Sequence, residues 1–277
     1  MSFQLSIDTL NLNLVSEKSA QDLTQFHHDN WTSHLFPRDF KFFDDLIKKN
    51  KVYELREELS KRIVGVCYVD DAKEQCNAFD RREFGGLFVI KEYQGTGVAQ
   101  ALCSVALIHS FAFDQTQGRL ISHIHENNKK PLKLFTKSLH FLKIGFEIVP
   151  YHIARKLKMD MGKKGLLVGN LYTFKFINFK KLSAWLNDFN HKNFELKSQH
   201  RHIKIKSELL ALVDVQNSID SLIELSKKTG NDDHVCKKCA NIKRLDLMIV
   251  NSWIVRFLYK PASITQGFVK FLINFSQ

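Results

Sequence analysis

The sequence lacks any run of about 18 uncharged apolar residues, the minimum that indicates a transmembrane helix. Its best approach to such a run, from Leu247 to Val255, is stopped by Asp246 on one side and Arg256 on the other. The N-terminus also lacks a basic segment followed by an apolar stretch, which is the pattern of a secretory signal peptide. We therefore predict no membrane span and no secretory signal.

Cysteine is scarce, and its count of five is odd. Small secreted domains pair their cysteines in even sets. The count therefore argues against a disulfide framework and for a reducing compartment, and we expect a cytoplasmic protein. Cys103 falls inside an apolar segment, where a thiol usually packs as a small hydrophobe.

Cys236 and Cys239 form a Cys-x-x-Cys pair, a spacing that suits zinc. A closed structural site needs four ligands, and the sequence has no second pair of this kind. His234 with His200 or His202 could complete a set. An unmetallated turn between helices is the favoured interpretation, so no metal is predicted.

Acidic residues are too few to balance the basic ones. The chain has 41 Lys and Arg against 29 Asp and Glu, a formal net charge of +12. Residues 180–277 alone hold 16 basic and 9 acidic residues. Such an excess favours an anionic partner, and it is denser in this last part of the chain.

One segment, residues 83–99, combines the features of a phosphate-binding loop. A short apolar strand leads into a turn that contains Gly95 and Gly97, and an apolar helix follows from Val98 to about Phe113. The first amides of a helix have no intrahelical acceptor, and the helix dipole adds partial positive charge there. Glycine removes the Cβ that would hold a phosphate away from the backbone. The segment therefore predicts a site for a phosphate-bearing cofactor.

Three kinds of glycine loop compete for this segment. A P-loop is excluded because Val98, and not lysine, follows Gly97. A dinucleotide-binding loop would use Gly95 and Gly97, although Gln100 stands where its third glycine belongs. Glu126, which ends the next expected strand, could bind a ribose, so this interpretation stays open.

The third kind of loop has the pattern Gln/Arg-x-x-Gly-x-Gly/Ala, which Gln94, Gly97 and Ala99 match. This hexapeptide resembles the acyl-CoA pyrophosphate loop of the GCN5-related N-acetyltransferases, the GNAT family. The elements after it also follow the family's order, which is a strand, an asparagine-bearing turn, a helix and a Gly-Phe pair opening another strand (119–125, Asn127–Asn128, 130–143 and Gly145–Phe146).

The segments before the loop fit the same order. Alternation and turn signals predict strands at 10–14, 51–57 and 62–69, and helices that start near Ser16 and over 37–50. With a last strand at 166–176, the resemblance implies a GNAT-type α/β (α+β) fold over about residues 5–178. Its sheet is mixed, mostly antiparallel and twisted, with helices on its faces.

After Phe179 the apolar residues recur at helical spacing. We therefore expect two domains, a GNAT-like acyltransferase domain over 1–179 and a basic all-helical extension over 180–277. A basic cluster in the extension either meets phosphates or lies on a solvated helix flank (Lys192, Lys197, His200, Arg201, His202, Lys204 and Lys206).

The resemblance implies acetyl-CoA as the cofactor and a V-shaped gap between the strands at 84–90 and 119–125 that takes the pantetheine. It also implies the groups that hold the coenzyme. These are backbone groups along the pantetheine, main-chain amides at the pyrophosphate, and an asparagine beside the arm (Phe88, Val89 and Ile90; Gln94, Gly95, Thr96, Gly97, Val98 and Ala99; Asn127 or Asn128).

A base must keep the attacking amine neutral. Glu83 lies where family members often place such a carboxylate, although a solvated strand-end acid is an equal interpretation. His123 and His125 share one face of their strand and face either the acceptor cleft or the interior. The position of His125 at the strand end slightly favours the cleft.

The sequence departs from the family at two points. Asn127 precedes Gly145 by 18 residues, a longer interval than in most members. The tyrosine that protonates the CoA thiolate in many members corresponds here to Phe135 or Phe141, and neither can donate a proton. Another acid, such as Ser138 or Tyr151, or water must then protonate the thiolate.

The resemblance and the charge together predict an acetyl-CoA-dependent N-acetyltransferase that acts on an amine of a macromolecule. The acceptor is either RNA, as tRNA or aminoacyl-tRNA, or a protein. The alternative is a GNAT-like binding or regulatory module that has lost catalysis. A dinucleotide-binding protein is less favoured.

Overall fold

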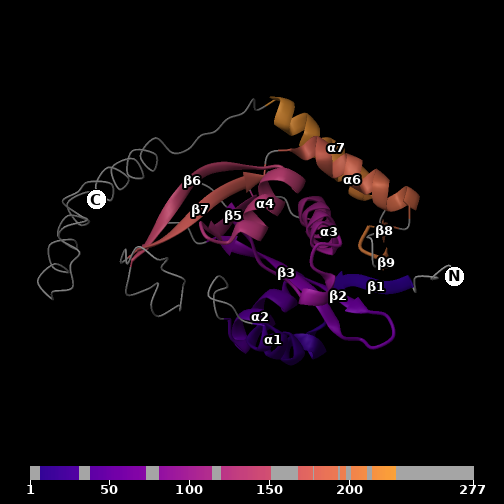
Figure 1. Ribbon diagram of the computed structural model, residues 1–277. Helices are drawn as coiled ribbons and strands as arrows, with labels where there is room; N and C mark the ends of the chain where they lie inside the picture. Colours follow the sequence, from indigo (N-terminus) through magenta and orange to yellow (C-terminus); the bar gives the residue numbers. More distant parts are fainter. Residues whose placement is uncertain are drawn as a thin grey trace, which may run out of the picture.

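The computed structural model describes residues 7–30, 38–72, 81–113, 120–150, 168–176, 178–192, 194–197, 201–210 and 214–228. Nine strands in this part of the chain form one sheet in the order β6-β7-β5-β4-β3-β2-β1-β9-β8 (Figure 1). The strands are β1 (Ile7–Leu14), β2 (Val52–Glu57), β3 (Ile63–Ala72), β4 (Arg81–Val89), β5 (Leu120–His125), β6 (Phe141–Pro150), β7 (Val168–Phe176), β8 (Glu195–Lys197) and β9 (His202–Lys206).

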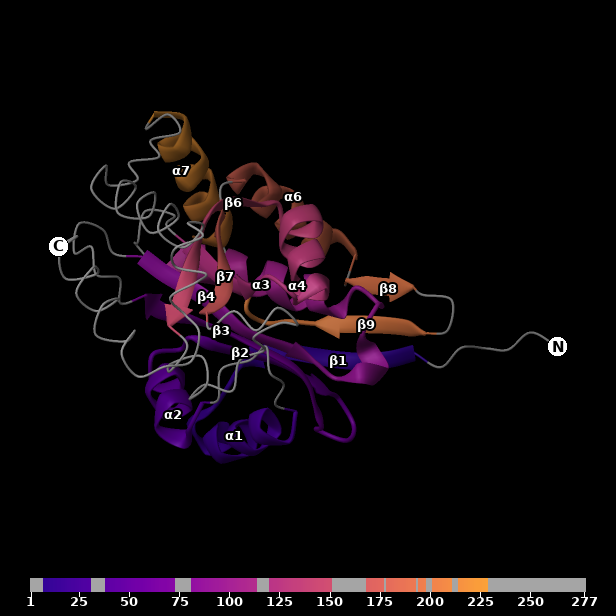
Figure 2. The same cartoon turned by 60° about the vertical axis from the view of Figure 1, so that its left-hand side comes forward.

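The helices cover both faces of the sheet. They are η1 (Glu17–Ser19), α1 (Ala20–Asp29), α2 (Phe40–Lys48), η2 (Lys91–Tyr93), α3 (Val98–Phe113), α4 (Lys129–Lys133), η3 (Leu134–Ser138), α6 (Phe179–Lys192) and α7 (Asp214–Lys228). Helices α1 and α2 lie on one face, and α3, α6 and α7 lie on the other (Figures 1 and 2).

Each face has its own apolar core. On the side of α1 and α2, Leu23 and Phe43 pack with Val66 and Tyr68 of β3. On the other side, α3 is buried almost all round and packs against the sheet and the helices that follow it. A helix that is apolar on all sides is stable only inside the protein. Its first turn is therefore held in a fixed position beside the end of β4.

The predicted mixed α/β fold is confirmed. The apolar helix has the predicted bounds of Val98 and Phe113. The strands predicted at 51–57, 62–69, 119–125 and 166–176 correspond to β2, β3, β5 and β7, with ends that differ by at most three residues.

The helix predicted over 130–143 is wrong in its second half. Leu132, Phe135 and Leu139 have helical spacing, which made the helix look longer than it is. Helix α4 and the π-turn η3 end at Ser138, His140 takes a positive φ of 57°, and β6 begins at the next residue. The helical segment therefore ends five residues before the predicted position, and residues 141–143 belong to strand β6.

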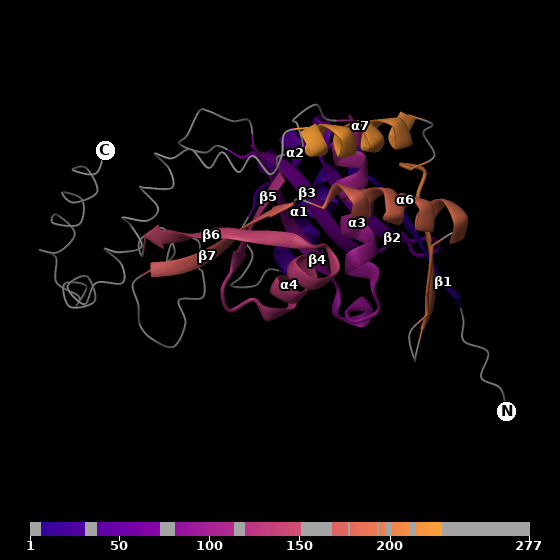
Figure 3. The same cartoon turned by 90° about the horizontal axis from the view of Figure 1, so that it is seen from above.

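The all-helical extension predicted after residue 179 is also wrong in part. Ile203 and Ile205 alternate with basic residues and are buried, as in a strand with one core face. Strand β9 pairs in parallel with β1, with Ile205 opposite Leu10, and β8 pairs with β9. Helices α6 and α7 lie across α3 when the molecule is seen from above (Figure 3). The described residues between 180 and 228 thus add strands β8 and β9 to the sheet and pack helices α6 and α7 against α3, while residues 229–277 lie outside the described part.

Candidate functional site

A gap opens between β4 and β5 in the middle of the sheet, as predicted. The two strands pair only at Arg82 with Leu120 and at Glu83 with Ile121. Beyond these pairs β4 continues along β3 as far as Val89, and β5 continues along β7. We call the space between their diverging edges the β4–β5 gap. Two strand edges that do not pair with each other can accept an extended ligand between them.

Strand β4 carries a bulge inside this gap. The β3–β4 register shifts between the pairs Val66–Phe88 and Tyr68–Gly85, so β4 has one extra residue there. Gly86, in the bulge, has a φ of +60°. Glycine is the residue that adopts this conformation without a steric penalty.

The peptide groups at the end of β4 point alternately to β3 and to the gap. The N–H of Ile90 donates to the carbonyl of Val64 at 2.9 Å. In an antiparallel pair, the peptide groups of successive residues point to opposite sides of the strand. Those of Phe88 therefore also point toward β3, and those of Val89 point toward the gap. Of the three residues predicted to bind pantetheine, Val89 faces the gap, and the N–H of Ile90 is bonded to β3.

The side chain of Gln94 joins the loop to two neighbours. Its Nε2 donates to the carbonyl of Val89 at 2.9 Å, and its Oε1 accepts from Lys130 Nζ at 2.8 Å. Thr96 Oγ1 donates to the carbonyl of Tyr93 at 2.7 Å. These bonds fix the loop between η2 and α3, and they bring the ammonium group of Lys130 from α4 to the loop.

The entrance of α3 combines two glycines with positive φ, +79° at Gly95 and +93° at Gly97. The N–H of Ala101 donates to the carbonyl of Gly97, so the amides of Val98 and Ala99 precede the first intrahelical donor. A Cβ added at Gly95 would meet nothing within 4 Å, whereas one at Gly97 would lie 3.3 Å from Leu196 of β8. The loop is therefore open at Gly95 and covered on one side of Gly97. Its amides, the dipole of α3 and Lys130 suit an anionic group.

A carboxylate and an imidazole meet at the closed end of the β4–β5 gap. Glu83 Oε1 lies 3.3 Å from His123 Nδ1, and both side chains are largely buried. Glu83 belongs to the last pair that joins β4 to β5, and His123 lies two residues beyond it on β5. The structure thus brings the predicted Glu83 together with His123, the less favoured of the two histidines.

His125 instead shapes the turn that leads into α4. It is only 4% exposed, its Nδ1 accepts from the N–H of Asn127 at 3.2 Å, and its carbonyl accepts from the N–H of Asn128 at 2.9 Å. The backbone of this asparagine turn is therefore ordered by His125. Ser138 ends η3 and is half-buried, and Tyr151 lies outside the described residues.

The two phenylalanines at the positions of the family's tyrosine are core residues. Phe135 is 3% exposed and packs against Phe84 and Phe141 with ring centroids 5.8 and 4.8 Å apart. No hydroxyl is present at either position, as the sequence indicated.

Three described members of the basic cluster are paired with carboxyl groups. Arg201 binds Asp8 at 2.8 Å, Lys206 binds Glu58 at 2.6 Å, and His202 lies 3.0 Å from Glu195. The part of this cluster on β8 and β9 is therefore closer to neutral than its composition suggests. The prediction that the cluster lies on helices is wrong for these strands.

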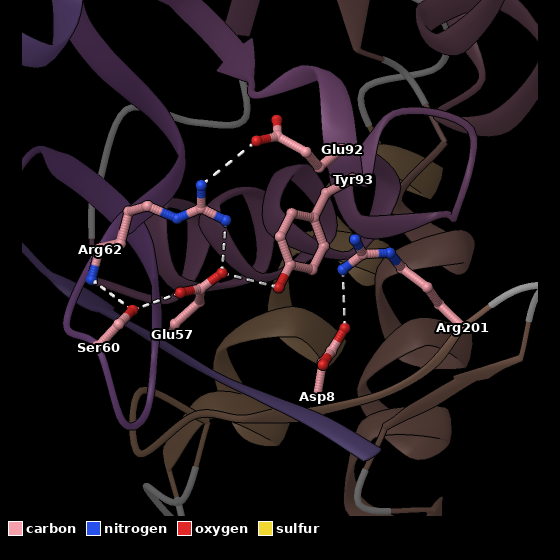
Figure 4. A network of polar contacts seen from close by, with 7 residues as sticks. All are labelled: Asp8, Glu57, Ser60, Arg62, Glu92, Tyr93 and Arg201. Atoms are coloured by element: carbon pink, nitrogen blue, oxygen red, sulfur yellow. Dashed lines mark hydrogen bonds and ion pairs between the residues drawn. The ribbon is translucent and has the colours of Figure 1, made fainter. Parts of the chain in front are cut away.

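Arg201 also belongs to a polar network beside the loop (Figure 4). Its guanidinium lies 4.7 Å from the centre of the Tyr93 ring. The Tyr93 hydroxyl donates to Glu57 at 3.0 Å, and Arg62 binds the same carboxylate at 2.7 Å. The network ties β1, the β2–β3 turn and the start of β9 to η2, directly before Gln94.

The remaining predictions concern metals and cysteines. Among the residues that the structure describes, no group of three or more His, Cys, Asp or Glu side chains is arranged to hold a metal ion. Cys236 and Cys239 lie outside those residues. Cys103 is fully buried in α3, and burial raises the pKa of its thiol, as expected of a packing residue.

A separate cavity of about 300 Å³ lies on the α3 face of the sheet. It is lined by the end of α3, including His109, and by Lys49, Lys51 and Arg82. The Tyr53 hydroxyl and His109 Nδ1 share a hydrogen bond of 3.0 Å, and burial lowers the pKa of His109 to about 4, so the imidazole is neutral. The residues that line this cavity do not include the loop.

Sequence reasoning missed two residues near the gap, Lys130 and Tyr68. Nothing in a single sequence indicates that Lys130 reaches Gln94 across 36 positions. Tyr68 lies over Gly85 and Gly86, and two adjacent glycines within a strand were the available signal. Such glycines mark a bulge or the close approach of another group.

None of the helices in the described part of the chain combines the length and the apolarity that a membrane crossing requires. Among curated proteins, no match to the chain is found.

Solved structures show limited similarity to the chain. Arabidopsis thaliana NAA60 in complex with acetyl-CoA is 15% identical, with a TM-score of 0.45 and coverage of 61% of this chain and 99% of that one. The ribosomal-protein-S5-alanine acetyltransferase of Vibrio fischeri is 16% identical, with a TM-score of 0.44 and coverage of 60% and 92%. An N-acetyltransferase of Staphylococcus aureus Mu50 is 14% identical, with a TM-score of 0.44 and coverage of 60% and 96%.

A family model gives the assignment. The model of the acetyltransferase (GNAT) family matches residues 19–141, which run from the last residue of η1 to the first residue of β6. The matched part includes the β4–β5 gap, the loop at Gly95 and Gly97, and the Glu83–His123 pair. The chain therefore contains a domain of the acetyltransferase (GNAT) family.

Proposed function

We propose that the protein is an acetyl-CoA-dependent N-acetyltransferase that transfers the acetyl group to an amine of a macromolecule. The observation that carries the proposal is the open loop at the entrance of α3, which adjoins the end of the β4–β5 gap. The loop suits a diphosphate, and the β4–β5 gap suits an extended chain such as a pantetheine arm. Acetyl-CoA has both parts, and it supplies the thioester that an amine attacks.

The loop would hold the diphosphate through its main-chain amides from Gln94 to Ala99. Glycine at 95 leaves the approach open, because a Cβ there would project into free space that the ligand needs. Lys130 would add a positive charge at the loop. The pantetheine would then run along the gap beside Val89, with Asn127 or Asn128 touching it.

Glu83 and His123 would prepare the acceptor amine. A protonated amine has no free electron pair, so it must lose a proton before it attacks. The Glu83 carboxylate, 3.3 Å from the His123 imidazole, can take that proton directly or through water, and the imidazole can share it. His125 supports this arrangement by ordering the turn at the end of the same strand.

The acceptor class is a protein amine or tRNA. The net charge of +12 supports an anionic acceptor such as tRNA. The ion pairs of Arg201 and Lys206 reduce the charge that β8 and β9 offer to phosphates, which supports a protein acceptor on that side. The alternative is a binding module without catalysis, and the phenylalanine at 135 is the observation that favours it.

Two measurements test the proposal. Isothermal titration with acetyl-CoA tests binding, and thiol release tests turnover with bulk tRNA or with a pool of short peptides that have free α-amino groups. We expect binding, and thiol release with one of the two acceptors. Glu83→Gln should bind acetyl-CoA as the wild type does and lose turnover by about 10²-fold or more, the usual contribution of a general base.

Glu92→Gln is the matched control, because Glu92 is an exposed carboxylate next to the loop that faces Arg62. It should keep both binding and turnover. Binding without thiol release from either acceptor would favour the noncatalytic module, and absence of binding would refute the whole proposal.

A further inference from the structure

The ring of Tyr68 covers the bulge in β4. A Cβ added at Gly86 would lie 2.0 Å from Tyr68 Cε1, and one at Gly85 would lie 3.0 Å from Cε2. Real Cβ atoms essentially never come as close as 2.0 Å, and 3.0 Å is a tight contact, so the two glycines make room for this ring. The tyrosine itself is only 4% exposed. The sequence therefore sets a large polar side chain directly on the strand that borders the gap.

The hydroxyl of Tyr68 lies where the gap begins. A Cβ built at Gly85 would be 3.3 Å from the Tyr68 oxygen, and Gly85 is two residues beyond Glu83, the last residue of β4 that pairs with β5. Because side chains alternate along a strand, Glu83 and the Cβ direction of Gly85 share one face. The phenol, the carboxylate and its partner His123 are thus gathered at the closed end of the gap.

Arg38 holds this hydroxyl through its oxygen. Its Nε and Nη2 both donate to the Tyr68 oxygen at 3.2 Å, so the oxygen is the acceptor in both bonds. The guanidinium also lies 4.3 Å from the ring centre of Phe42, which holds it in place. A cation beside the oxygen stabilises a phenolate if the proton leaves.

Burial raises the pKa of Tyr68 to about 12, with Arg38 acting in the opposite direction. The phenol therefore keeps its proton at neutral pH. The positions from which the family's tyrosine would act hold Phe135 and Phe141, so the proton must come from elsewhere.

We propose that Tyr68, held by Arg38, is the proton donor for the thiolate that leaves in this reaction; the inference rests on the function proposed above. The amine nitrogen attacks the thioester carbonyl carbon and forms the C–N bond, and the C–S bond then breaks. The thiolate takes the hydroxyl proton of Tyr68. The amine has meanwhile passed its proton to Glu83 and His123. This proton then moves to the Tyr68 phenolate beside Arg38 and restores the phenol. The products are an amide and a thiol, and the protein returns to its starting state.

Tyr68→Phe tests this role, because it removes the hydroxyl and keeps the ring that covers Gly85 and Gly86. We expect acetyl-CoA affinity and the unfolding midpoint to stay close to the wild type, while kcat at pH 7 falls by about 10²-fold, within the usual contribution of a general acid. The deficit should shrink as the pH passes about 8.5, the ordinary pKa of a thiol, because a thiolate then leaves without needing a proton.

Tyr53→Phe is the matched control. It removes an equally buried hydroxyl, bonded to His109, from the α3 face of the same sheet. We expect it to lower stability without changing the pH profile of kcat. Arg38→Lys keeps the positive charge and should retain more turnover than Arg38→Met.

The outcomes separate this inference from the proposed function. A wild-type protein that releases no thiol with the peptide pool or bulk tRNA overturns both. An active wild type with unchanged turnover in Tyr68→Phe overturns only the proton-donor role. A pH-independent loss of kcat in Tyr68→Phe, accompanied by weaker acetyl-CoA binding, would make Tyr68 a structural residue.

Discussion

Adding one methyl group at Gly86 tests how Tyr68 packs on the bulge of β4. Gly86 has a φ of +60°, and an L-residue in this region costs about 1–2 kcal/mol. The new Cβ would also lie 2.0 Å from Tyr68 Cε1 and 2.4 Å from Cδ1, so the ring must move. Overpacking of this kind costs about 1–3 kcal/mol. Gly86→Ala should therefore lower the free energy of unfolding by about 2–5 kcal/mol.

Gly95→Ala is the matched control, because it has a similar φ of +79° and open space around the added Cβ. It should lose only the backbone cost of about 1–2 kcal/mol. Urea unfolding followed by tryptophan fluorescence measures both values. In a Tyr68→Val background the ring is absent, so Gly86→Ala should cost no more than Gly95→Ala. Equal costs of Gly86→Ala with and without the ring would refute the packing that we describe.

Three further predictions concern the surroundings of the site. The Arg62 guanidinium and neighbouring hydroxyls lower the pKa of Glu57 from 4.5 to about 2, so its stabilising effect is present above about pH 4.5 and is lost as the pH falls toward 2. Glu57→Gln should lower the free energy of unfolding by about 1 kcal/mol at pH 7, a value reduced for solvent screening, and should remove this pH dependence. Urea unfolding between pH 2 and 7 measures both effects. The same pH dependence in the wild type and the variant would contradict the prediction. Lys130→Ala should weaken acetyl-CoA binding about 3- to 10-fold in calorimetry, because it removes the charged partner of Gln94, and unchanged affinity would exclude that role. Asp39→Ala removes the side-chain cap of α2 and should lower stability by about 1 kcal/mol, and a loss below 0.2 kcal/mol would show that the cap contributes nothing.

The sequence predicted those parts of the fold that depend on local pattern. The strand, glycine turn and apolar helix around Gly97 have strong periodicity and turn chemistry, and the structure has them at the predicted positions. The strand at 202–206 was missed because its five residues alternate only two buried isoleucines with charged residues. Such a short alternating segment forms a strand only if it can pair with the edge of a sheet. Here that edge belongs to β1, which is nearly 200 residues away in the sequence.

The candidate site shows the same division. Glu83 and the loop residues could be proposed from the sequence because residue type and spacing carry their chemistry. The choice between His123 and His125 needed the register between β4 and β5, which no single sequence contains. Tyr68 was missed because it reads as an ordinary strand residue. Its role depends on two glycines of the neighbouring strand.

The central claim is that main-chain amides at the entrance of α3 bind the diphosphate of acetyl-CoA. Isothermal titration of the full chain with acetyl-CoA and with acetyl-pantetheine, which has the same thioester arm but no diphosphate, tests it most directly. Charge-assisted hydrogen bonds contribute about 1.5–3 kcal/mol each, so acetyl-pantetheine should bind at least about tenfold more weakly than acetyl-CoA. Equal affinity for the two ligands, or no binding of acetyl-CoA, would contradict the claim.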